Sequence, residues 1–175
     1  MAFLDPVTAI RSFGLAEGLK VADFGVGPGH FAFAAAEAVG KNGMVYAVDL
    51  QKELLAKVKN EAIKRDLNIE VLWGDLEKEG GSHIKEGLID LVVATNILFQ
   101  LSERPTFLRE AKRVLHSKGR LILIDWSDSF GGLGPQAGDV VTATHARKLA
   151  EEAGFVYDKD IPGGDHHWGM ILRKP

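Results

Sequence analysis

Three glycines alternate with other residues directly after an acid that ends an apolar run. Asp23 closes the run, and Gly25, Gly27 and Gly29 follow before a helical pattern begins at His30. Glycine permits positive φ and lets a ligand approach the backbone where a Cβ would otherwise stand. The next helix presents unpaired N–H groups to the same ligand. The segment therefore predicts a nucleotide-type binding loop, and the alternative is a glycine-rich turn that binds nothing.

The spacing of these glycines bears on which nucleotide the loop holds. The dinucleotide fingerprint is G-x-G-x-x-G, and its third glycine allows close packing of the helix. This chain has Gly25-x-Gly27-x-Gly29, with His30 at the position of the third fingerprint glycine. A side chain there disfavours a pyrophosphate, so an NAD(P)-binding oxidoreductase is the weaker interpretation.

Three polar residues follow other strand-like runs, where they would meet the glycine loop at one edge of a sheet. Asp49 follows the run 44–48, and an acid at this distance from the loop suits ribose hydroxyls. Asp75 follows the run 69–73, and Asn96 lies near the end of the run 88–98. The plainer alternatives are a helix cap for Asp49, a Gly-Asp turn for Asp75, and a helix cap or loop amide for Asn96.

The order of these motifs resembles class I S-adenosylmethionine (SAM) methyltransferases, over nearly the whole chain. The acid and glycine loop resemble motif I, the run near Asn96 resembles motif IV, and 113–126 resembles the R-V-L-K-P-G-G helix-turn-strand. The most similar branch acts on small molecules and includes ubiquinone/menaquinone-type C-methyltransferases. Val26 and Pro28 stand where motif I commonly has Cys and Thr, and His-Ser-Lys replaces Lys-Pro-Gly. All motif I glycines are present, so the departures leave SAM binding little affected.

This resemblance implies SAM as the cosubstrate and assigns roles to the residues around it. Asp49 would bind the ribose, Asp23 would face the methionine amine, and Asp75 would meet the adenine amino group. The implied cofactor-binding residues are Asp23, Gly25, Val26, Gly27, Pro28, Gly29, Asp49, Leu50, Asp75, Leu76 and Asn96.

Methyl transfer requires a general base only where the acceptor must lose a proton. We take His30 and His167 as the catalytic candidates, with core packing and an exposed hairpin turn as the respective alternatives. The acceptor is expected to be chosen at a rim formed by Trp126, His145 and His167. Adjacent histidines on a strand point to opposite sides, so no metal site is expected. We interpret Phe99, Trp126 and Trp168 as lining an apolar acceptor pocket, and core packing is the alternative.

Strand-like runs alternate with helical patterns, which predicts βαβ units and a parallel sheet. The first helix is expected to have Asp5 as its cap and Pro6 at its first position, and the later helices to cover 30–39, 52–65, 105–115 and 140–153. Only 159–166 separates the runs 155–158 and 167–173, so these should pair antiparallel. The glycine-rich stretch 127–138 has no periodicity and is expected to be a long loop.

These elements together predict an α/β fold. We expect a Rossmann-like three-layer sandwich with a seven-stranded, mostly parallel sheet and an antiparallel C-terminal hairpin. Residues 1–175 are expected to form a single SAM-dependent methyltransferase domain, in which 1–17 is an N-terminal helix or cap segment.

The composition limits the function further. The formal net charge of −3 gives no bulk attraction to nucleic acid, and zero cysteines exclude disulfides, thiolate metal sites and the multi-cysteine arsenite methyltransferase mechanism. No signal peptide or membrane-spanning run is present, so a cytoplasmic protein is expected. The expected partner is a small-molecule acceptor, and a homodimer stays open. The alternative functions are a nucleic-acid or protein methyltransferase and a non-catalytic SAM-binding protein.

Overall fold

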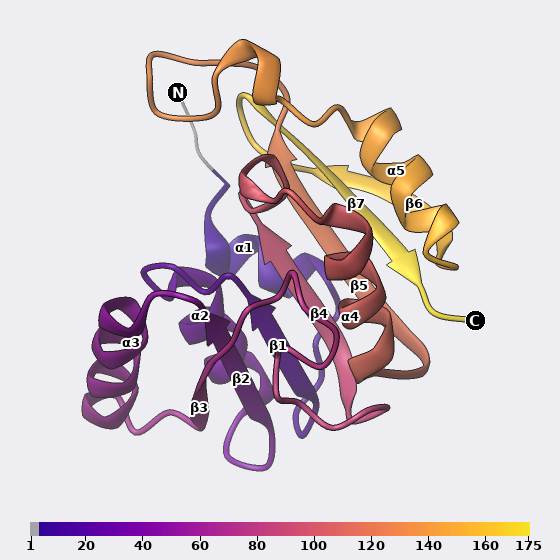
Figure 1. Cartoon of the computed structure of the whole chain (residues 1–175). Helices are drawn as coiled ribbons and strands as arrows, with labels where there is room; N and C mark the ends of the chain where they lie inside the picture. The colour runs from indigo at the N-terminus through magenta and orange to yellow at the C-terminus, as the bar shows by residue number, and fades with distance from the viewer. Residues whose placement is uncertain (1–3) are drawn as a thin grey trace.

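The computed structural model describes residues 4–175 as a seven-stranded sheet with helices on both faces (Figure 1). The strands are β1 (Lys20–Phe24), β2 (Met44–Asp49), β3 (Ile69–Trp73), β4 (Ile89–Thr95), β5 (Leu115–Trp126), β6 (Val156–Pro162) and β7 (His167–Arg173). The helices are α1 (Pro6–Ser12), α2 (His30–Val39), α3 (Lys52–Lys64), α4 (Arg104–Val114) and α5 (Ala143–Glu152), with short 3₁₀ turns η1 (Leu98–Gln100) and η2 (Ala137–Asp139). Residues 1–3 of the expected 1–17 segment lie outside the described residues.

The strand order is β3-β2-β1-β4-β5-β7-β6, so the direction of winding reverses between the neighbouring strands β1 and β4. All pairs from β3 to β5 are parallel. Strand β7 is antiparallel to both β5 and β6. The predicted mostly parallel sheet with an antiparallel C-terminal hairpin is therefore confirmed. In such sheets a ligand crevice is expected beyond the carboxyl ends of the strands, at the point of reversal.

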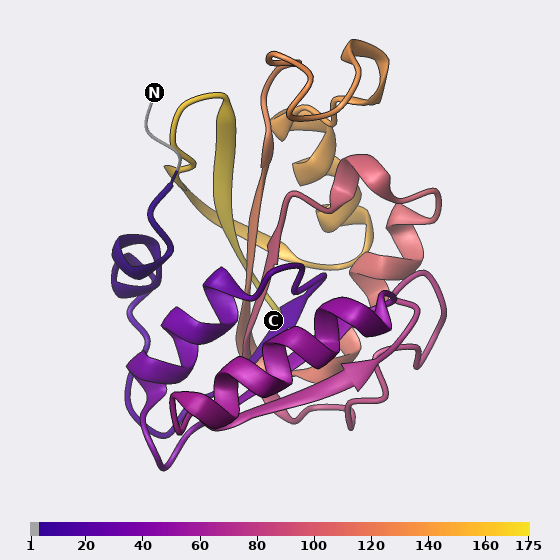
Figure 2. The same ribbon diagram turned by 90° about the vertical axis from the view of Figure 1, so that its left-hand side faces the viewer.

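Helices α1, α2 and α3 cover one face of the sheet, and α4 and α5 cover the other (Figure 1 and Figure 2). Strand side chains alternate between the faces, so neighbouring residues enter different cores. In β4, Val92 packs in the core beneath α4 and α5, whereas Val93 packs in the core beneath α1, α2 and α3. Burial on both faces explains why the central strands appear in the sequence as continuous apolar runs.

Helix ends follow local capping chemistry. The Oδ2 atom of Asp5 accepts a hydrogen bond from the Thr8 amide at 2.8 Å, and Pro6 occupies the first turn, as predicted. Helix α2 begins directly after Gly29, which is left-handed with φ of 90°, and ends at Val39, with Gly40 as its C-cap. No helix in residues 4–175 is long and apolar enough to cross a membrane.

Some expected boundaries are corrected by the structure. The segment 113–126 contains no separate turn, because α4 ends at Val114 and β5 starts at Leu115. The start of β5 is held by pairing of Leu115 with Ile89, and the pairing then shifts register. Helix α5 begins later than expected, at Ala143, because the Thr142 side chain caps it.

The last hairpin is longer than its sequence suggested. Strand β6 runs to Pro162 instead of ending near residue 158, because it pairs with β7 as far as Trp168. The connection is thereby reduced to residues 163–166. The loop after β5 is present as predicted, and it contains the short 3₁₀ turn η2.

Candidate functional site

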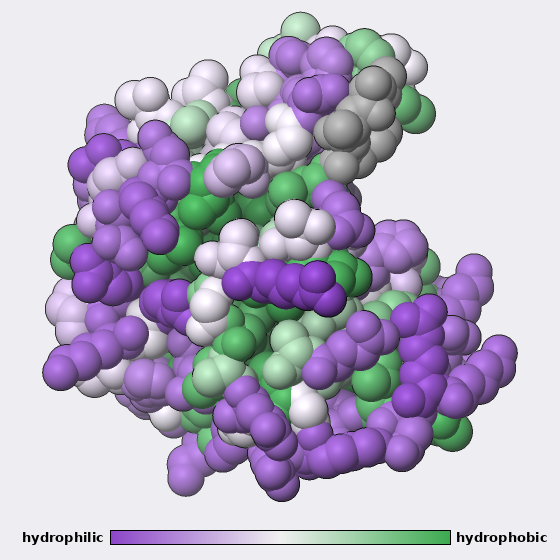
Figure 3. Space-filling model, turned by 180° about the vertical axis from the view of Figure 1, so that it is seen from behind, coloured by the Kyte–Doolittle hydropathy of each residue, from purple (hydrophilic) through white to green (hydrophobic). Residues whose placement is uncertain are grey.

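A cavity of about 740 Å³ opens at the carboxyl edge of the sheet, over the ends of β1, β2, β3 and β4. Every residue predicted to bind the cofactor lines this cavity except Gly29. Figure 3 shows hydrophobic surface gathered in a hollow of the face opposite that of Figure 1, with hydrophilic surface around it. The chain thus brings the sequence-predicted polar and glycine residues to one concave site.

The three loop glycines have three different environments. A Cβ at Gly25 would stand 2.5 Å from the Cδ1 atom of Ile97, and one at Gly29 would stand 2.9 Å from Phe33 and Val58. Gly29 is therefore required for packing of α2 against α3, which explains its absence from the cavity wall. A Cβ at Gly27 would meet nothing within 4 Å. Because Gly27 lines the cavity, that open space is part of the cavity.

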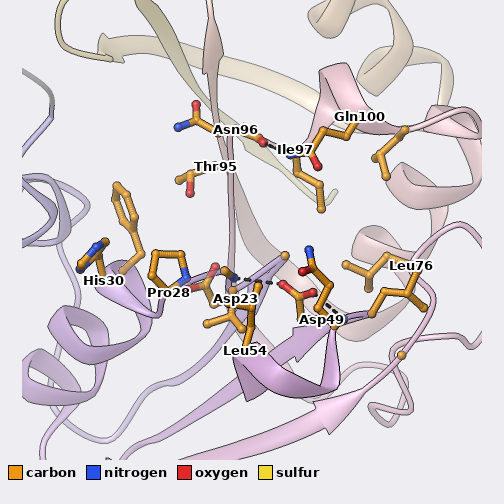
Figure 4. Close-up of a pocket in the computed structure, with 18 of the residues that line it drawn as sticks. Asp23, Pro28, His30, Asp49, Leu54, Leu76, Thr95, Asn96, Ile97 and Gln100 are labelled. Atoms are coloured by element: carbon orange, nitrogen blue, oxygen red, sulfur yellow. Dashed lines mark hydrogen bonds between the residues drawn. The ribbon is translucent and has the colours of Figure 1, made fainter. Parts of the chain in front are cut away.

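Asp49 connects the glycine loop to the start of α3. Its Oδ2 atom accepts a hydrogen bond from the Gly27 amide at 3.0 Å, and its Oδ1 atom accepts one from the Gln51 amide at 2.9 Å (Figure 4). The residue that caps α3 by position is Gln51, with no side-chain capping bond. The carboxylate therefore has a supporting role for the helix start, and it also lines the cavity.

Asp23 lies at the floor of the cavity with only 2% of its surface exposed. Its buried Oδ1 atom has no hydrogen-bond partner among the described residues. Burial, together with the nearby negative charge of Asp49, raises the pKa of Asp23 to about 7. Since a buried polar atom normally has a partner, the unsatisfied carboxyl oxygen marks a position where a bound donor fits.

Asp75 and Leu76 lie on the segment that follows β3, and both line the cavity. The Asp75 carboxylate accepts a hydrogen bond from the Glu77 amide at 3.1 Å and forms an ion pair with Lys78 at 3.1 Å. Asp75 thus makes the local contacts of a turn residue, and it also forms part of the cavity wall.

A buried network around Glu110 of α4 holds this segment in place. The Glu110 carboxylate accepts hydrogen bonds from the amides of Gly80 and Ser82 at 2.9 and 3.1 Å, from the Ser82 hydroxyl, and from Arg113 at 2.7 Å. Burial alone would raise the pKa of Glu110, but the bonds from Arg113, Ser82 and Gly80 outweigh it and lower the pKa to about 2. The ionised carboxylate therefore fixes the chain just beyond Asp75 and Leu76.

The wall beyond β4 is held by another buried acid. Asp125 is 1% exposed, and its Oδ2 atom accepts a hydrogen bond from the Leu98 amide at 2.8 Å. Burial raises its pKa, partly offset by the bonds from the Trp126 and Leu98 amides. Asn96 is left-handed with φ of 54°, and its carbonyl accepts a bond from the Gln100 side chain at 2.8 Å (Figure 4). Asn96 and Gln100 both line the cavity.

The two catalytic candidates lie in different places. His30, the first residue of α2, is exposed and lines the cavity. His167 is not among the cavity-lining residues. Its ring packs against Trp126 with centroids 4.2 Å apart, and its Nδ1 atom lies 2.8 Å from the Asp165 carbonyl oxygen.

The expected acceptor rim is not part of the cavity either. Neither Trp126 nor His145 lines it, and nor do Phe99 and Trp168. Trp168 donates its indole N–H to the Val141 carbonyl at 2.8 Å, which anchors the approach to α5. Residues 4–175 contain no group of three or more His, Asp or Glu side chains placed to hold a metal ion.

The long loop after β5 is tied to the β6–β7 turn. The Nδ1 atom of His166 lies 2.8 Å from the Oδ2 atom of Asp128, and its ring stacks on Phe130 at 4.0 Å. Gly134 lies so close to the Trp126 indole that a Cβ there would approach it to 2.6 Å. Trp126 of the expected rim thus packs under this loop.

Sequence reasoning missed several cavity residues. Gln51 and Leu54 follow the predicted Asp49 closely, and Glu77 follows Asp75. Phe31 directly follows His30, and Thr95 and Ile97 flank Asn96, so proximity along the chain was an available signal. Other missed wall residues have no such signal, because folding brings them from the start of the chain and from the segment after β4. They include Leu4, Pro6, Gln100 and Leu101.

Comparison with known proteins places these features in a family. The family described as "Methyltransferase domain" matches residues 15–159. A solved SAM-dependent methyltransferase from Aquifex aeolicus superposes with a TM-score of 0.89 at 29% identity, covering 99% of this chain and 91% of that one.

Curated relatives with different printed activities also match. An arsenite methyltransferase of Halobacterium salinarum is 29% identical over 63% of this chain and 28% of its own length. A ubiquinone/menaquinone C-methyltransferase of Laribacter hongkongensis is 27% identical over 72% and 50%. A ribosomal protein L11 methyltransferase of Thermotoga petrophila is 34% identical over 69% and 43%. The chain thus spans half or less of these relatives.

Proposed function

This chain belongs to the SAM-dependent methyltransferase family, and on that premise we propose that it transfers a methyl group from SAM to a small-molecule acceptor. The observation that carries the proposal is the buried Asp23 oxygen, unsatisfied at the floor of a cavity lined by Gly27 and Asp49. A ligand with a cationic amine and a ribose suits that set of groups, because the amine donates to Asp23 and the hydroxyls reach Asp49.

The proposed cosubstrate site uses the residues predicted from the sequence. Asp49 binds the ribose hydroxyls, and Asp75 with the Leu76 amide meets the adenine. Leu50 packs against the nucleoside, and the segment at Asn96 closes the opposite side. Val26, Pro28 and the glycines Gly25 and Gly27 shape the loop, while Gly29 contributes through helix packing.

Transfer from a sulfonium is an in-line displacement, so the protein mainly has to hold the acceptor at near-attack distance. The walls of the cavity supply that restraint. Where the acceptor must lose a proton, His30 is the proposed base, since it is the histidine that lines the cavity. We propose a packing role for His167, which lies against Trp126.

The proposed methyl acceptor is a small molecule. Two of the relatives described above are named for arsenite and for ubiquinone/menaquinone biosynthesis, which supports a small molecule. The relative named for ribosomal protein L11 supports a protein acceptor as the second candidate. The absence of cysteine argues against a cysteine-dependent arsenite mechanism in this chain. We also propose that the chain forms a single domain and acts in the cytoplasm. In this proposal it binds no nucleic acid and forms a homodimer.

Thermal unfolding with S-adenosylhomocysteine (SAH) or NAD tests the proposed function. A ligand at about 100 times its Kd adds about 2.7 kcal/mol to the stability of the folded state. For a domain of this size, that corresponds to a rise in Tm of about 5–10 °C. We expect this rise with SAH and no rise with NAD. Stabilisation by NAD alone would overturn the proposal.

A further inference from the structure

The charged groups of the cavity are distributed unevenly between its two ends. Four carboxylates line it, from Asp23, Asp49, Asp75 and Glu77, and the described residues contribute no Lys or Arg to the wall. All four belong to β1, β2 or the segment after β3. We define the α1 end of the cavity by the remaining residues at its other side: Leu4, Pro6, His30, Phe31, Thr95 and Asn96.

The α1 end is apolar with a short polar edge. Leu4, Pro6 and Phe31 contribute apolar surface, and His30, Thr95 and Asn96 contribute an imidazole, a hydroxyl and an amide. Figure 4 shows His30, Thr95 and Asn96 on one side of the cavity, and Asp49 and Leu76 on the other. No carboxylate or permanently cationic side chain of the described chain lines the α1 end.

The proposed position of SAM leaves the α1 end for the acceptor. Its nucleoside occupies the side of Asp49 and Asp75, and its amine lies over Asp23. An acceptor therefore approaches the sulfur from the α1 end. This step rests on the proposed function.

From this distribution of charge we infer that the acceptor is an uncharged, largely apolar molecule with a single polar edge. A carboxylate or phosphate on the acceptor would be buried at the α1 end without a cationic side chain, which is unfavourable. An ammonium group on the acceptor would lie beside the positively charged sulfonium of SAM, and no carboxylate lines the α1 end to balance its charge. A hydroxyl or carbonyl finds partners in His30, Thr95 and Asn96.

Three probes of one shape and different charge test this inference. Protein loaded with sinefungin, a SAM analogue with an amine in place of the methylsulfonium, is titrated with 2-naphthol, 2-naphthoate and 2-naphthylmethylamine at pH 7. We expect the neutral naphthol to bind at least 10-fold more tightly than either ion. Naphthoate or the amine binding as tightly as naphthol overturns the inference, as does binding by none of the three to loaded protein.

A positive charge introduced at the α1 end tests whether the probes bind at that end of the cavity. Thr95→Lys places an ammonium in the cavity and should increase naphthoate affinity at least 10-fold. The matched control is Thr144→Lys, which makes the same change on the exposed surface of α5 and should leave the order of affinities unchanged. If Thr95→Lys fails to fold, Phe31→Lys replaces it at the same end of the cavity. Equal effects at the α1 end and at Thr144 would overturn the inference.

Failure of the proposed function gives a different result. If neither sinefungin nor SAH binds the protein, the cosubstrate assignment is wrong whatever the probes do. If both bind and the probes show the wrong order of affinity, only the acceptor class is wrong.

Discussion

The carboxylate of Asp49 accepts a hydrogen bond from the backbone amide of Gly27 at 3.0 Å, which joins the end of β2 to the loop after β1. The same carboxylate accepts a bond from the Gln51 amide. One acid thus shapes the loop and faces the cavity, so its removal should affect ligand binding more than folding.

Asp49→Ala is expected to reduce SAH affinity about 10- to 100-fold, as for the loss of charge-assisted hydrogen bonds worth about 1.5–3 kcal/mol. Calorimetric titration measures the affinity, and circular dichroism checks the fold. The matched control is Asp90→Ala, because Asp90 accepts a bond from the Lys20 amide at 2.7 Å at the opposite edge of the sheet. Unchanged SAH affinity in Asp49→Ala would remove Asp49 from the site.

The buried Asp23 should make both stability and ligand binding depend on pH. Its pKa is raised from 3.8 to about 7 in the folded protein, so the folded state holds the proton more tightly than the unfolded chain. The stability contribution of this group is therefore greatest at low pH and declines as pH rises from about 4 to 7. Asp23→Asn should remove that decline in the ligand-free protein.

Ligand binding should show the opposite trend. A bound ammonium favours the ionised carboxylate, so SAH affinity should increase between pH 6 and 8 in the wild type. Asp23→Asn should bind more weakly and lose the part of the pH dependence that Asp23 supplies. Titration across this range in buffers of different ionisation enthalpy counts the released protons. Identical pH profiles in the two proteins would show that Asp23 does not meet the amine.

Substitutions of different loop glycines should affect SAH affinity and protein stability to different extents. Gly27→Ala places a Cβ in the cavity, so SAH affinity should fall while the folded state loses only the cost of positive φ, about 1 kcal/mol. Gly29→Ala should instead lower stability by more than this, because its Cβ meets Phe33 and Val58. Gly14→Ala, which has positive φ in open space away from the cavity, is the control for backbone strain. Equal losses of affinity in Gly14→Ala and Gly27→Ala would contradict the assignment.

The sequence predicted the parts of this structure that depend on local pattern. The run 69–73 is β3 without change, and Asp5 caps α1, because apolar periodicity and capping chemistry act over a few residues. The acids at strand ends could be placed at one edge because parallel strands share a carboxyl edge. The carboxylate of Glu110, by contrast, bonds Gly80 across 30 positions of sequence, and nothing in the local pattern indicates that pairing.

The residues of the expected acceptor rim do not line the cavity, for a related reason. Trp126 and His167 are residue types that occur at active sites, and they pair directly across β5 and β7. Whether such a pair faces the cavity depends on the loop after β5, which packs Gly134 over the indole. The position of a glycine-rich loop without periodicity cannot be derived from its sequence.

Glu110→Ala should destabilise the protein by about 3–5 kcal/mol, because it leaves Arg113 without its carboxylate and the amides of Gly80 and Ser82 without an acceptor. Urea denaturation at pH 7 measures this loss. The matched control is Glu151→Ala, which breaks an exposed ion pair with Arg147 and should cost less than about 1 kcal/mol.

The dependence of stability on acidic pH tests whether the ionised Glu110 carboxylate is the cause of this loss. The folded-state pKa of Glu110 is lowered from 4.5 to about 2, so its stabilising contribution is complete above pH 4.5 and is lost as pH falls towards 2. Glu110→Gln should lose stability at pH 7 and show a shallower decline between pH 4.5 and 2 than the wild type. Because the network fixes the segment after β3, the same variant should also bind SAH more weakly, through misplacement of Asp75 and Leu76. An acid decline as steep as in the wild type would show that another carboxylate controls acid unfolding.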